Sequence, residues 1–256
     1  AMAFALAQQT PRSAGLRIFG WLGRVAFAFP GSEQKRTIEH LTSIYGQEWG
    51  AAKVRSVASE VWCNLGKNLF DMVYLPRQDG NHWDTVVKDS GFSLVNELYN
   101  QKRGIVVITG HMGCFDLLLH HFARKGLKSF AIGRRSFDDR IEQMIRTVRS
   151  GENIAYLDRE DSARKVIRLL GEGRVFGVLI DQDAHVEGVF AHFLGKLAYT
   201  PSAPVRIAMK MNIPVVVATI ARQRDESHLL SVSEVLQLKD SGNFERDLLD
   251  NVEMIN

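Results

Sequence analysis

The pattern of hydrophobic and polar positions changes near residue 83. Before it, apolar residues recur at intervals of three and four, the period of an amphipathic helix, so we expect helices over residues 1–30, 32–45 and 49–75. After it, short apolar runs alternate with helical segments, which is typical of an α/β core. The sequence therefore predicts an N-terminal helical region, residues 1–82, and a core, residues 83–256, in which a mixed, largely parallel sheet is flanked by helices.

Within the core, the central strand is expected at Ile105–Thr109. These five apolar or β-branched residues stand between glycines, as in a strand buried on both faces of a parallel sheet. The remaining pattern predicts strands at 86–87, 129–132, 154–156, 175–180, 215–220 and 229–235, and helices at 92–101, 114–125, 138–149, 162–170 and 202–211.

His111 and Asp116 lie in the turn and helix start that follow the central strand. Five residues along one helix turn through about 140°, so the two side chains meet only if His111 is in the loop and Asp116 in the first helical turn. The carboxylate would then hold the imidazole in one tautomer and leave its other nitrogen as a general base. A histidine at a strand end is also often a polar residue with no catalytic role, and spacing alone does not separate the two interpretations.

Other polar residues follow neighbouring strand ends. Asp181, Gln182 and Asp183 come after strand 175–180, and Arg134 comes after strand 129–132. Parallel strands present their carboxyl ends to one crevice, where open α/β sheets bind ligands. The aspartates are equally able to cap a turn.

Two further arginines, Arg146 and Arg149, are three residues apart and share one face of the helix at 138–149. Guanidinium groups there suit phosphate, although such a helix face is often only solvated.

The residues His111-Met112-Gly113-Cys114-Phe115-Asp116 resemble the H-x4-D/E signature of the glycerolipid and lysophospholipid acyltransferase superfamily. More narrowly, they resemble H-x-G-N-W-E of the bacterial lipid A biosynthesis (lauroyl/myristoyl) acyltransferases, with Cys114, Phe115 and Asp116 in place of Asn, Trp and Glu. Asn64-x-Gly66, Asp181-Gln182-Asp183 and the apolar loop Gly188–Gly195 are similar to further elements of that family. Members usually continue into a helix with a Trp-x-His-x-Arg element that residues 237–256 lack, so we expect a truncated or divergent member.

This resemblance implies an O-acyltransferase with a glycerolipid acyltransferase-like fold. His111 is then the general base and Asp116 its orienting carboxylate, while substrate contacts are expected from Arg134, Arg146, Arg149 and Asp181. The donor is an acyl-carrier-protein or acyl-CoA thioester, the acceptor a lipid A precursor or a related glycolipid or lysophospholipid, and no cofactor or metal is implied. The apolar loop Gly188–Gly195 is expected either to line an acyl-chain slot or to pack against the core.

Composition narrows the setting of this activity. The net charge of +3 does not call for nucleic acid, and the distant pair Cys63 and Cys114 fits a reducing compartment. The sequence contains no run of 18 uncharged apolar residues, so it predicts no clear membrane-spanning helix. The apolar face within residues 1–30 is expected either to lie on a membrane or to pack as an ordinary helix. With the resemblance, this places the protein at the cytoplasmic face of the bacterial inner membrane.

Three alternatives remain open from the residues alone. Cys114 and His111 form a possible nucleophile and base of a hydrolase. Asp181, Asp183 and His185 offer ligands for a metal-dependent hydrolase. Finally, the basic and apolar surfaces also suit a lipid-binding module without catalysis.

Overall fold

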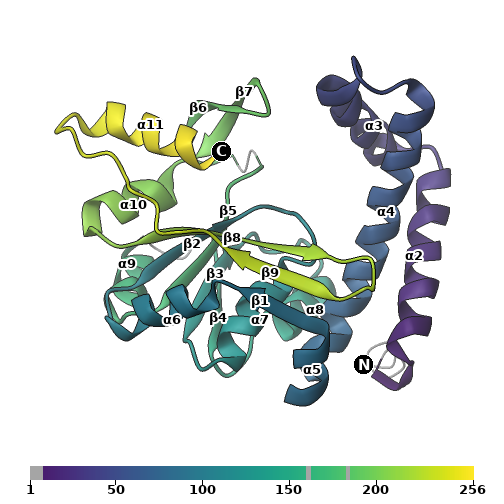
Figure 1. The fold of residues 1–256 in the computed structure, drawn as a ribbon, viewed down its shortest axis with the longest axis horizontal. Coiled ribbons are helices and arrows are strands. Elements are labelled where there is room, and N and C mark those ends of the chain that lie inside the picture. The colour runs from purple at the N-terminus through teal and green to yellow at the C-terminus, as the bar shows by residue number, and fades with distance from the viewer. Residues whose placement is uncertain (1–7, 160–162, 183–184) are drawn as a thin grey trace. The chain divides into compact units, whose positions relative to one another are not determined.

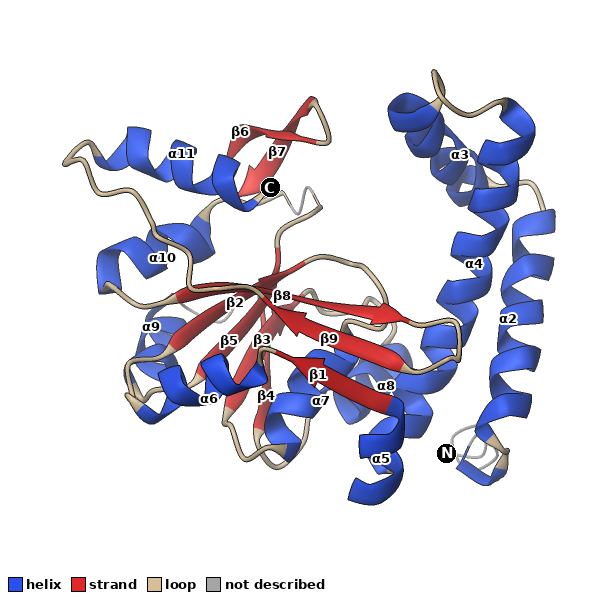
Figure 2. Ribbon diagram, viewed as in Figure 1, coloured by secondary structure: helices blue, strands red, loops and turns tan. Residues whose placement is uncertain are grey.

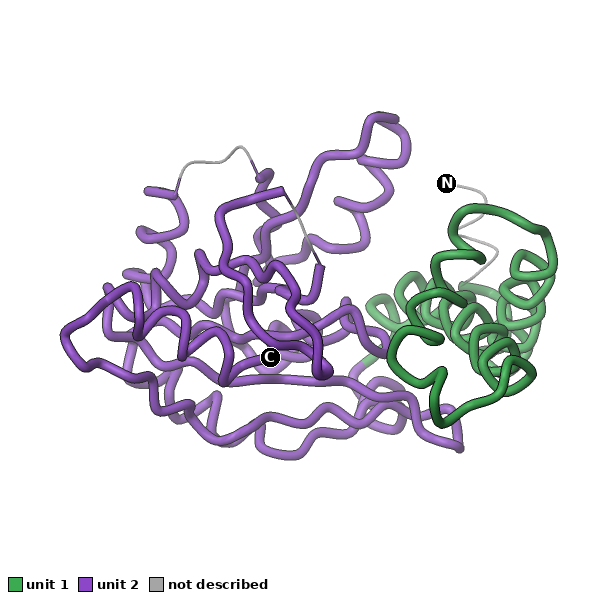
Figure 3. The backbone as a smooth tube through the Cα atoms, turned by 90° about the horizontal axis from the view of Figure 1, so that it is seen from above, with its two compact units in different colours: residues 1–79 green, residues 80–256 purple. Residues whose placement is uncertain are grey.

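The computed structural model describes residues 8–159, 163–182 and 185–256, and the chain forms two compact units (Figures 1 and 3). Unit 1 comprises residues 1–79 and unit 2 residues 80–256. None of the helices in the described ranges has both the length and the apolar character needed to cross a bilayer.

Unit 1 is helical, with α2 (Arg12–Ala28), α3 (Ser32–Tyr45), α4 (Ala51–Tyr74) and the short 3-10 helix η1 (Leu75–Arg77). Glycines allow α2 and α4 to approach closely. A Cβ atom on Gly23 would lie 2.1 Å from the Trp62 carbonyl oxygen, and one on Gly66 would lie 2.0 Å from that of Phe19. Backbone-to-backbone packing therefore holds this helix pair together.

Unit 2 contains a seven-stranded sheet in the order β1-β9-β8-β2-β5-β3-β4 (Figure 2). Its strands are β1 (Val87–Ser90), β2 (Ile105–Thr109), β3 (Ser129–Gly133), β4 (Ile154–Asp158), β5 (Val175–Leu179), β8 (Val215–Arg222) and β9 (His228–Val232). All neighbouring strands pair in parallel except β8 and β9. The prediction of a mixed, largely parallel sheet flanked by helices is confirmed.

The helices of unit 2 are α5 (Gly80–Val86), α6 (Phe92–Asn100), α7 (Asp116–Arg124), α8 (Asp139–Arg149), α9 (Ala163–Gly171), α10 (Ala203–Met211) and α11 (Phe244–Ile255). They leave β2 buried along its whole length. Val106 and Ile108 of β2 pack into one apolar core cluster with residues of α9 and α10, such as Leu170 and Val205. The loop after β2 is thus attached to the most rigid part of the unit.

Three elements differ from the sequence expectation. Residues 76–82 follow the predicted helix at 49–75 and were assigned no helix, but α5 begins there at Gly80. Residues 188–195 were expected to form a loop, but β6 (Gly188–Phe193) pairs with β7 (Lys196–Pro201) as a hairpin. Helix α11 was not predicted at all. The helix expected at 1–30 corresponds to α2, which begins only at Arg12, and residues 1–7 lie outside the described residues. The other predicted strands and helices are present within a few residues of their expected ends, and Ser162 lies outside the described residues.

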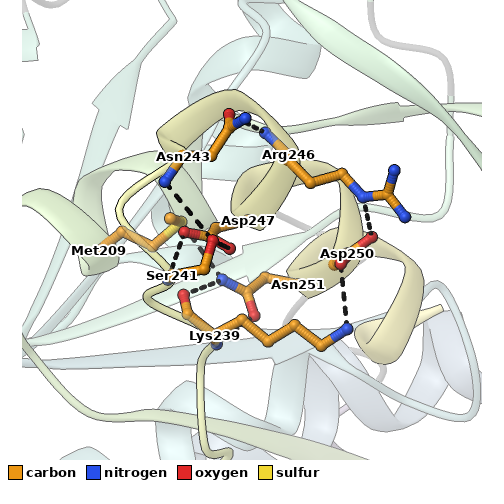
Figure 4. Close-up of polar contacts among 8 residues, drawn as sticks. All are labelled: Met209, Lys239, Ser241, Asn243, Arg246, Asp247, Asp250 and Asn251. Carbon is orange, nitrogen blue, oxygen red and sulfur yellow. Dashed lines mark hydrogen bonds and ion pairs between the residues drawn. The ribbon is translucent and has the colours of Figure 1, made fainter.

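Helix α11 is held by buried polar groups near its start (Figure 4). Asp247 accepts hydrogen bonds from the backbone N–H and the hydroxyl of Ser241, at 2.7 and 2.8 Å. Asn251 bonds both the N–H and the carbonyl of Lys239. These contacts satisfy side chains that are otherwise removed from water, on a helix whose Leu248 and Val252 pack into the apolar core beside them.

We expect Gly66→Ala to lower the free energy of unfolding by about 1–3 kcal/mol, because the added methyl group meets a backbone oxygen that cannot rotate away. In an open helix the same change stabilises by about 0.5–1 kcal/mol. Denaturant unfolding of the full chain, followed by circular dichroism, measures the difference. Gly50→Ala, with no atom within 4 Å of the new Cβ, is the control, and a Gly66→Ala protein as stable as the control contradicts the prediction.

Candidate active site

Four adjacent parallel strands deliver polar side chains to one edge of the sheet. His111 follows β2, Asp181 follows β5, Arg134 follows β3 and Arg159 follows β4. These four strands are direct neighbours in the order β2-β5-β3-β4, and each of the four residues follows the carboxyl end of its own strand. This is the edge at which open α/β sheets bind ligands.

His111 and Asp181 are joined by two hydrogen bonds. The imidazole Nδ1 lies 2.8 Å from Asp181 Oδ1, and the His111 backbone N–H donates to Oδ2 at 2.6 Å. Because an ionised carboxylate only accepts hydrogen bonds, Nδ1 carries the proton and Nε2 presents a lone pair. The arrangement is that of a histidine prepared to act as a base.

Burial of Asp181 acts to raise the pKa of its carboxyl group, but the hydrogen bonds from the side chain and backbone of His111 together outweigh burial. The pKa of Asp181 therefore lies below its ordinary value. The carboxylate thus stays ionised near neutral pH.

Two glycines shape the turn that carries His111. A Cβ on Gly110 would lie 3.0 Å from Asp181 Oδ2, so a side chain there would crowd the carboxylate. Gly113 has φ +58°, and a Cβ on it would lie 1.7 Å from the Ile220 carbonyl oxygen. The turn thus packs against β8 in a conformation that favours glycine.

Asp116 does not hold His111, contrary to the sequence expectation. It lies in the first turn of α7 as predicted, but its Oδ1 accepts a 2.6 Å hydrogen bond from Arg149 Nε. Arg149 also donates to the Tyr156 hydroxyl, at 3.2 Å. Burial acts to lower the pKa of Arg149, but Asp116 and Tyr156 outweigh it and the pKa is raised. The sequence spacing allowed Asp116 to pair with His111, but the position of α8 brings Arg149 to Asp116 instead.

The other predicted arginines separate into two groups. Arg134 is exposed on the wall of a cavity, 5.1 Å from the Phe137 ring, and forms no ion pair within the described residues. Arg146 instead bonds Glu142 and Asp158 and does not line this cavity. Arg159, which the sequence reasoning missed, lines it together with Arg134. The sequence feature that could have identified Arg159 is its position directly after a predicted strand, at the same edge of the sheet as Arg134.

The cavity has a volume of about 640 Å³ and is mainly apolar. His111, Arg134 and Gln182 lie at the carboxyl edge of the sheet, and from there the lining continues between the helices and the strands. Its apolar walls come from α7, the central strands, α9 and α10, and include Leu118, Leu119, Phe122, Val107, Phe176, Val178, Val166 and Ile207. None of residues 188–195 belongs to this lining, so the expectation that they line an apolar slot is wrong.

The residues of the alternative mechanisms are placed as follows. Cys114 is buried, with 2% of its surface exposed, which removes its thiol from a nucleophile's position at the cavity. Asp183 lies outside the described residues. Across the ranges that the structure describes, no three His, Cys, Asp or Glu side chains are grouped to bind a metal ion.

A family model described as bacterial lipid A biosynthesis acyltransferase matches residues 1–250 of the chain. The match covers unit 1 and unit 2 as far as residue 250, and it includes every residue of the site described above. No curated protein matched the chain in a direct sequence search.

In a His111→Ala variant we expect the pKa of Asp181 to rise, because the side-chain hydrogen bond that lowers it is lost while burial, which raises it, remains. Since the folded-state pKa of Asp181 is depressed, its carboxylate stabilises the fold above the unfolded-state value of about 4. That contribution is lost as the pH falls through the folded-state pKa.

Carbon-13 NMR titration of the aspartate carboxyl groups measures this change. Asp116→Asn, at a carboxylate that does not touch the pair, is the control. An Asp181 pKa that is the same in the wild type and in His111→Ala would contradict the prediction.

Proposed function

The chain belongs to the bacterial lipid A biosynthesis acyltransferase family, and from this we propose that it moves a fatty acyl chain from a thioester to a hydroxyl group of a lipid A precursor. Family membership makes it an O-acyltransferase. The proposal concerns the donor, the acceptor and the residues that act. The observation that supports it most is the His111–Asp181 pair at the polar end of an apolar cavity.

In the proposed reaction, His111 Nε2 removes the proton from the acceptor hydroxyl. The acceptor oxygen forms a bond to the thioester carbonyl carbon, the carbon–sulfur bond breaks, and the imidazolium returns the proton to the leaving thiolate. Asp181 orients the ring and stabilises its positive charge. The acceptor attacks directly, so no acyl-enzyme is required.

Asp116 has a different role in this proposal from the one expected from its spacing. Its carboxylate positions Arg149, whose guanidinium lies over the rings of Phe115 and Tyr156 at the cavity wall. Phe115 in turn contacts the His111 ring, with centroids 5.0 Å apart. Asp116 therefore supports the catalytic histidine indirectly, through the group of side chains beside it.

The arginines on the cavity wall suit the anionic parts of the substrates. Arg134 has no carboxylate partner within the described residues, and a guanidinium recognises phosphate through a fork of hydrogen bonds. A lipid A precursor carries phosphate, and so does the phosphopantetheine arm of acyl carrier protein or of acyl-CoA. We assign Arg134 to phosphate binding, with Arg159 beside it.

The apolar cavity suits the acyl chain of the donor. Its walls are aliphatic and aromatic side chains, and burial of each methylene group contributes about 0.8 kcal/mol. No cofactor enters this mechanism, since the thioester supplies the activation.

The proposed location is the cytoplasmic face of the inner membrane, where a water-soluble donor meets a lipid acceptor. In unit 1, Ile18, Trp21 and Leu22 are exposed on one face of α2. Spacings of three and four residues place them together, which supports contact with a membrane surface.

We expect His111→Ala to lower kcat by about 10²–10⁴-fold, because the general base is lost. Asp181→Asn should lower kcat more than it raises KM, since it removes the orienting charge but not the cavity. The assay follows transfer of a labelled acyl group from acyl carrier protein and from acyl-CoA to lipid A precursors and lysophospholipids.

Cys114→Ala is the matched control, because a neighbour of His111 that takes no part should leave transfer intact. Loss of activity in Cys114→Ala, with a normal circular dichroism spectrum, would favour the hydrolase. Full transfer by His111→Ala would exclude the proposed base. Lipid binding by the wild type without transfer from either donor would favour a non-catalytic module.

We expect Gly177→Val to shift donor preference towards shorter acyl chains. Gly177 lines the cavity, and a Cβ there already lies 2.7 Å from Leu119 Cδ2, so added methyl groups occupy space between β5 and α7. Each excluded methylene should lower kcat/KM for long donors by roughly fourfold. Gly171→Ala, with no atom within 4 Å of the new Cβ, is the control. An unchanged chain-length profile in Gly177→Val would contradict this use of the cavity.

A further inference from the structure

The hairpin of β6 and β7 is separate from the seven-stranded sheet and lies beside α11 (Figure 2). Its register pairs Phe190 with Tyr199 and His192 with Leu197. Side chains alternate along each strand, so these four share one face, and Val189 and Ala191 belong to the other. Ala191 is fully buried in the apolar core that includes residues of α11, which makes the face with Phe190 the outer one.

Large apolar side chains are exposed on the outer face and at the tip of this hairpin. We call Phe190, Phe193, Leu194 and Leu197 the hairpin patch. The exposed fractions of Phe190, Leu194 and Leu197 are 66%, 57% and 64%. All four residues lie within the strands and the turn of one hairpin, and the Phe190 ring packs on Tyr199 of the facing strand with centroids 5.2 Å apart. Contiguous exposed apolar groups mark interaction surfaces.

The tip itself is unusual in its residue choice. Leu194 and Gly195 both have positive φ, +49° and +77°, as in the two-residue hairpin turn that prefers Asn-Gly. Leucine adopts this conformation rarely, and here its side chain also projects into solvent. Leucine at this position therefore costs the isolated protein backbone strain and also exposes an apolar side chain to water, which points to a role in binding.

The charges and the position of the hairpin identify its partner. Residues 188–201 contain no Asp or Glu, Lys196 stands next to the tip, and Glu253 of α11, which reaches this face, is paired with His192. Val186, just before β6, and Pro201, at the end of β7, both line the substrate cavity. The hairpin thus begins and ends at the cavity, presents apolar groups outward and carries a cation beside them, a combination that suits an anionic lipid surface.

We propose that the β6–β7 hairpin inserts its tip into the interfacial layer of an anionic bilayer and holds the cavity next to the membrane that contains the lipid acceptor. The proposal rests on the proposed function for the nature of that acceptor. The apolar side chains of the patch enter the acyl boundary, and Lys196 meets lipid phosphate. The acceptor can then reach His111 without leaving the membrane surface.

An environment-sensitive fluorophore at the tip tests insertion directly. Cys63 and Cys114 are buried, so a Leu194→Cys variant of the full chain is labelled selectively with a nitrobenzoxadiazole maleimide. We expect a blue shift of its emission, and quenching by nitroxide lipids, on adding vesicles of phosphatidylcholine with phosphatidylglycerol. Phosphatidylcholine alone should produce less response, as should high salt.

Ile167→Cys on α9, also at an exposed apolar residue, is the labelling control and should not respond. Absence of a response at residue 194, whether or not the protein sediments with vesicles, would overturn the proposal. So would a label that responds to acyl carrier protein but not to vesicles.

Leu194→Asn separates membrane binding from folding. Asparagine suits the turn better than leucine, so we expect an equal or higher melting temperature together with about tenfold weaker vesicle binding. Leu197→Thr, which introduces a β-branched residue that suits a strand, should weaken binding similarly, and Ile167→Gln should not. Vesicle binding that is unchanged in both hairpin variants would overturn the proposal.

Activity with two forms of the acceptor distinguishes this proposal from the proposed function. Leu194→Asn should lower transfer to vesicle-embedded acceptor and leave transfer to detergent-dispersed acceptor unchanged. If the wild type transfers no acyl group in either form, the proposed function fails, while the fluorescence result still decides whether the hairpin inserts.

Discussion

The two hydrogen bonds between His111 and Asp181 are the constraint on which the site depends. They connect the loop after β2 to the loop after β5, the neighbouring strand in the middle of the sheet. Both oxygens of the carboxylate are used, one by the backbone and one by the ring, so the turn and the imidazole are held together. Because β2 is buried along its length, His111 follows directly on a strand that is packed on both faces.

The second group of side chains beside the site has a complementary role. Arg149 lies largely out of water between Asp116, Phe115 and Tyr156, and the carboxylate compensates the burial of its charge. Arg134, by contrast, lies on the cavity wall with no carboxylate partner in the described residues. The site thus combines a neutralised arginine that builds its wall with an exposed arginine that is available to an anionic substrate.

Unit 2 has apolar surface in two places, on the walls of the cavity and on the outside of the β6–β7 hairpin. Inside, the cavity walls are apolar and lead from the histidine between the helices and strands, which suits an acyl chain. Outside, the hairpin patch presents side chains of similar kinds to solvent, on a hairpin whose two ends line that cavity. One segment of chain therefore links the place proposed for catalysis to the surface proposed for the lipid, so the orientation of the protein on a membrane and access to the site are coupled.

The sequence by itself determined the fold class, the order of most strands and helices, and the position of His111 in a strand-to-helix turn. Hydrophobic periodicity depends on local burial, so it located Ile105–Thr109 and Val175–Leu179 well. It did not predict α11, because the buried face of this helix carries the polar residues Asp247 and Asn251 beside the core residues Leu248 and Val252, which obscures the hydrophobic period. The hairpin was missed for a different reason, since residues 188–195 were interpreted as a loop from their resemblance to a family element and not from their own hydrophobic pattern.

Only the tertiary structure decided which carboxylate holds the histidine. Five residues separate His111 from Asp116 and seventy from Asp181, and local spacing favours the nearer pair. Strand order brings β5 next to β2, and the position of α8 brings Arg149 to Asp116. Pairing across a sheet is set by packing among distant elements, which no short motif contains; the motif supplied the histidine, and the fold selected its partner.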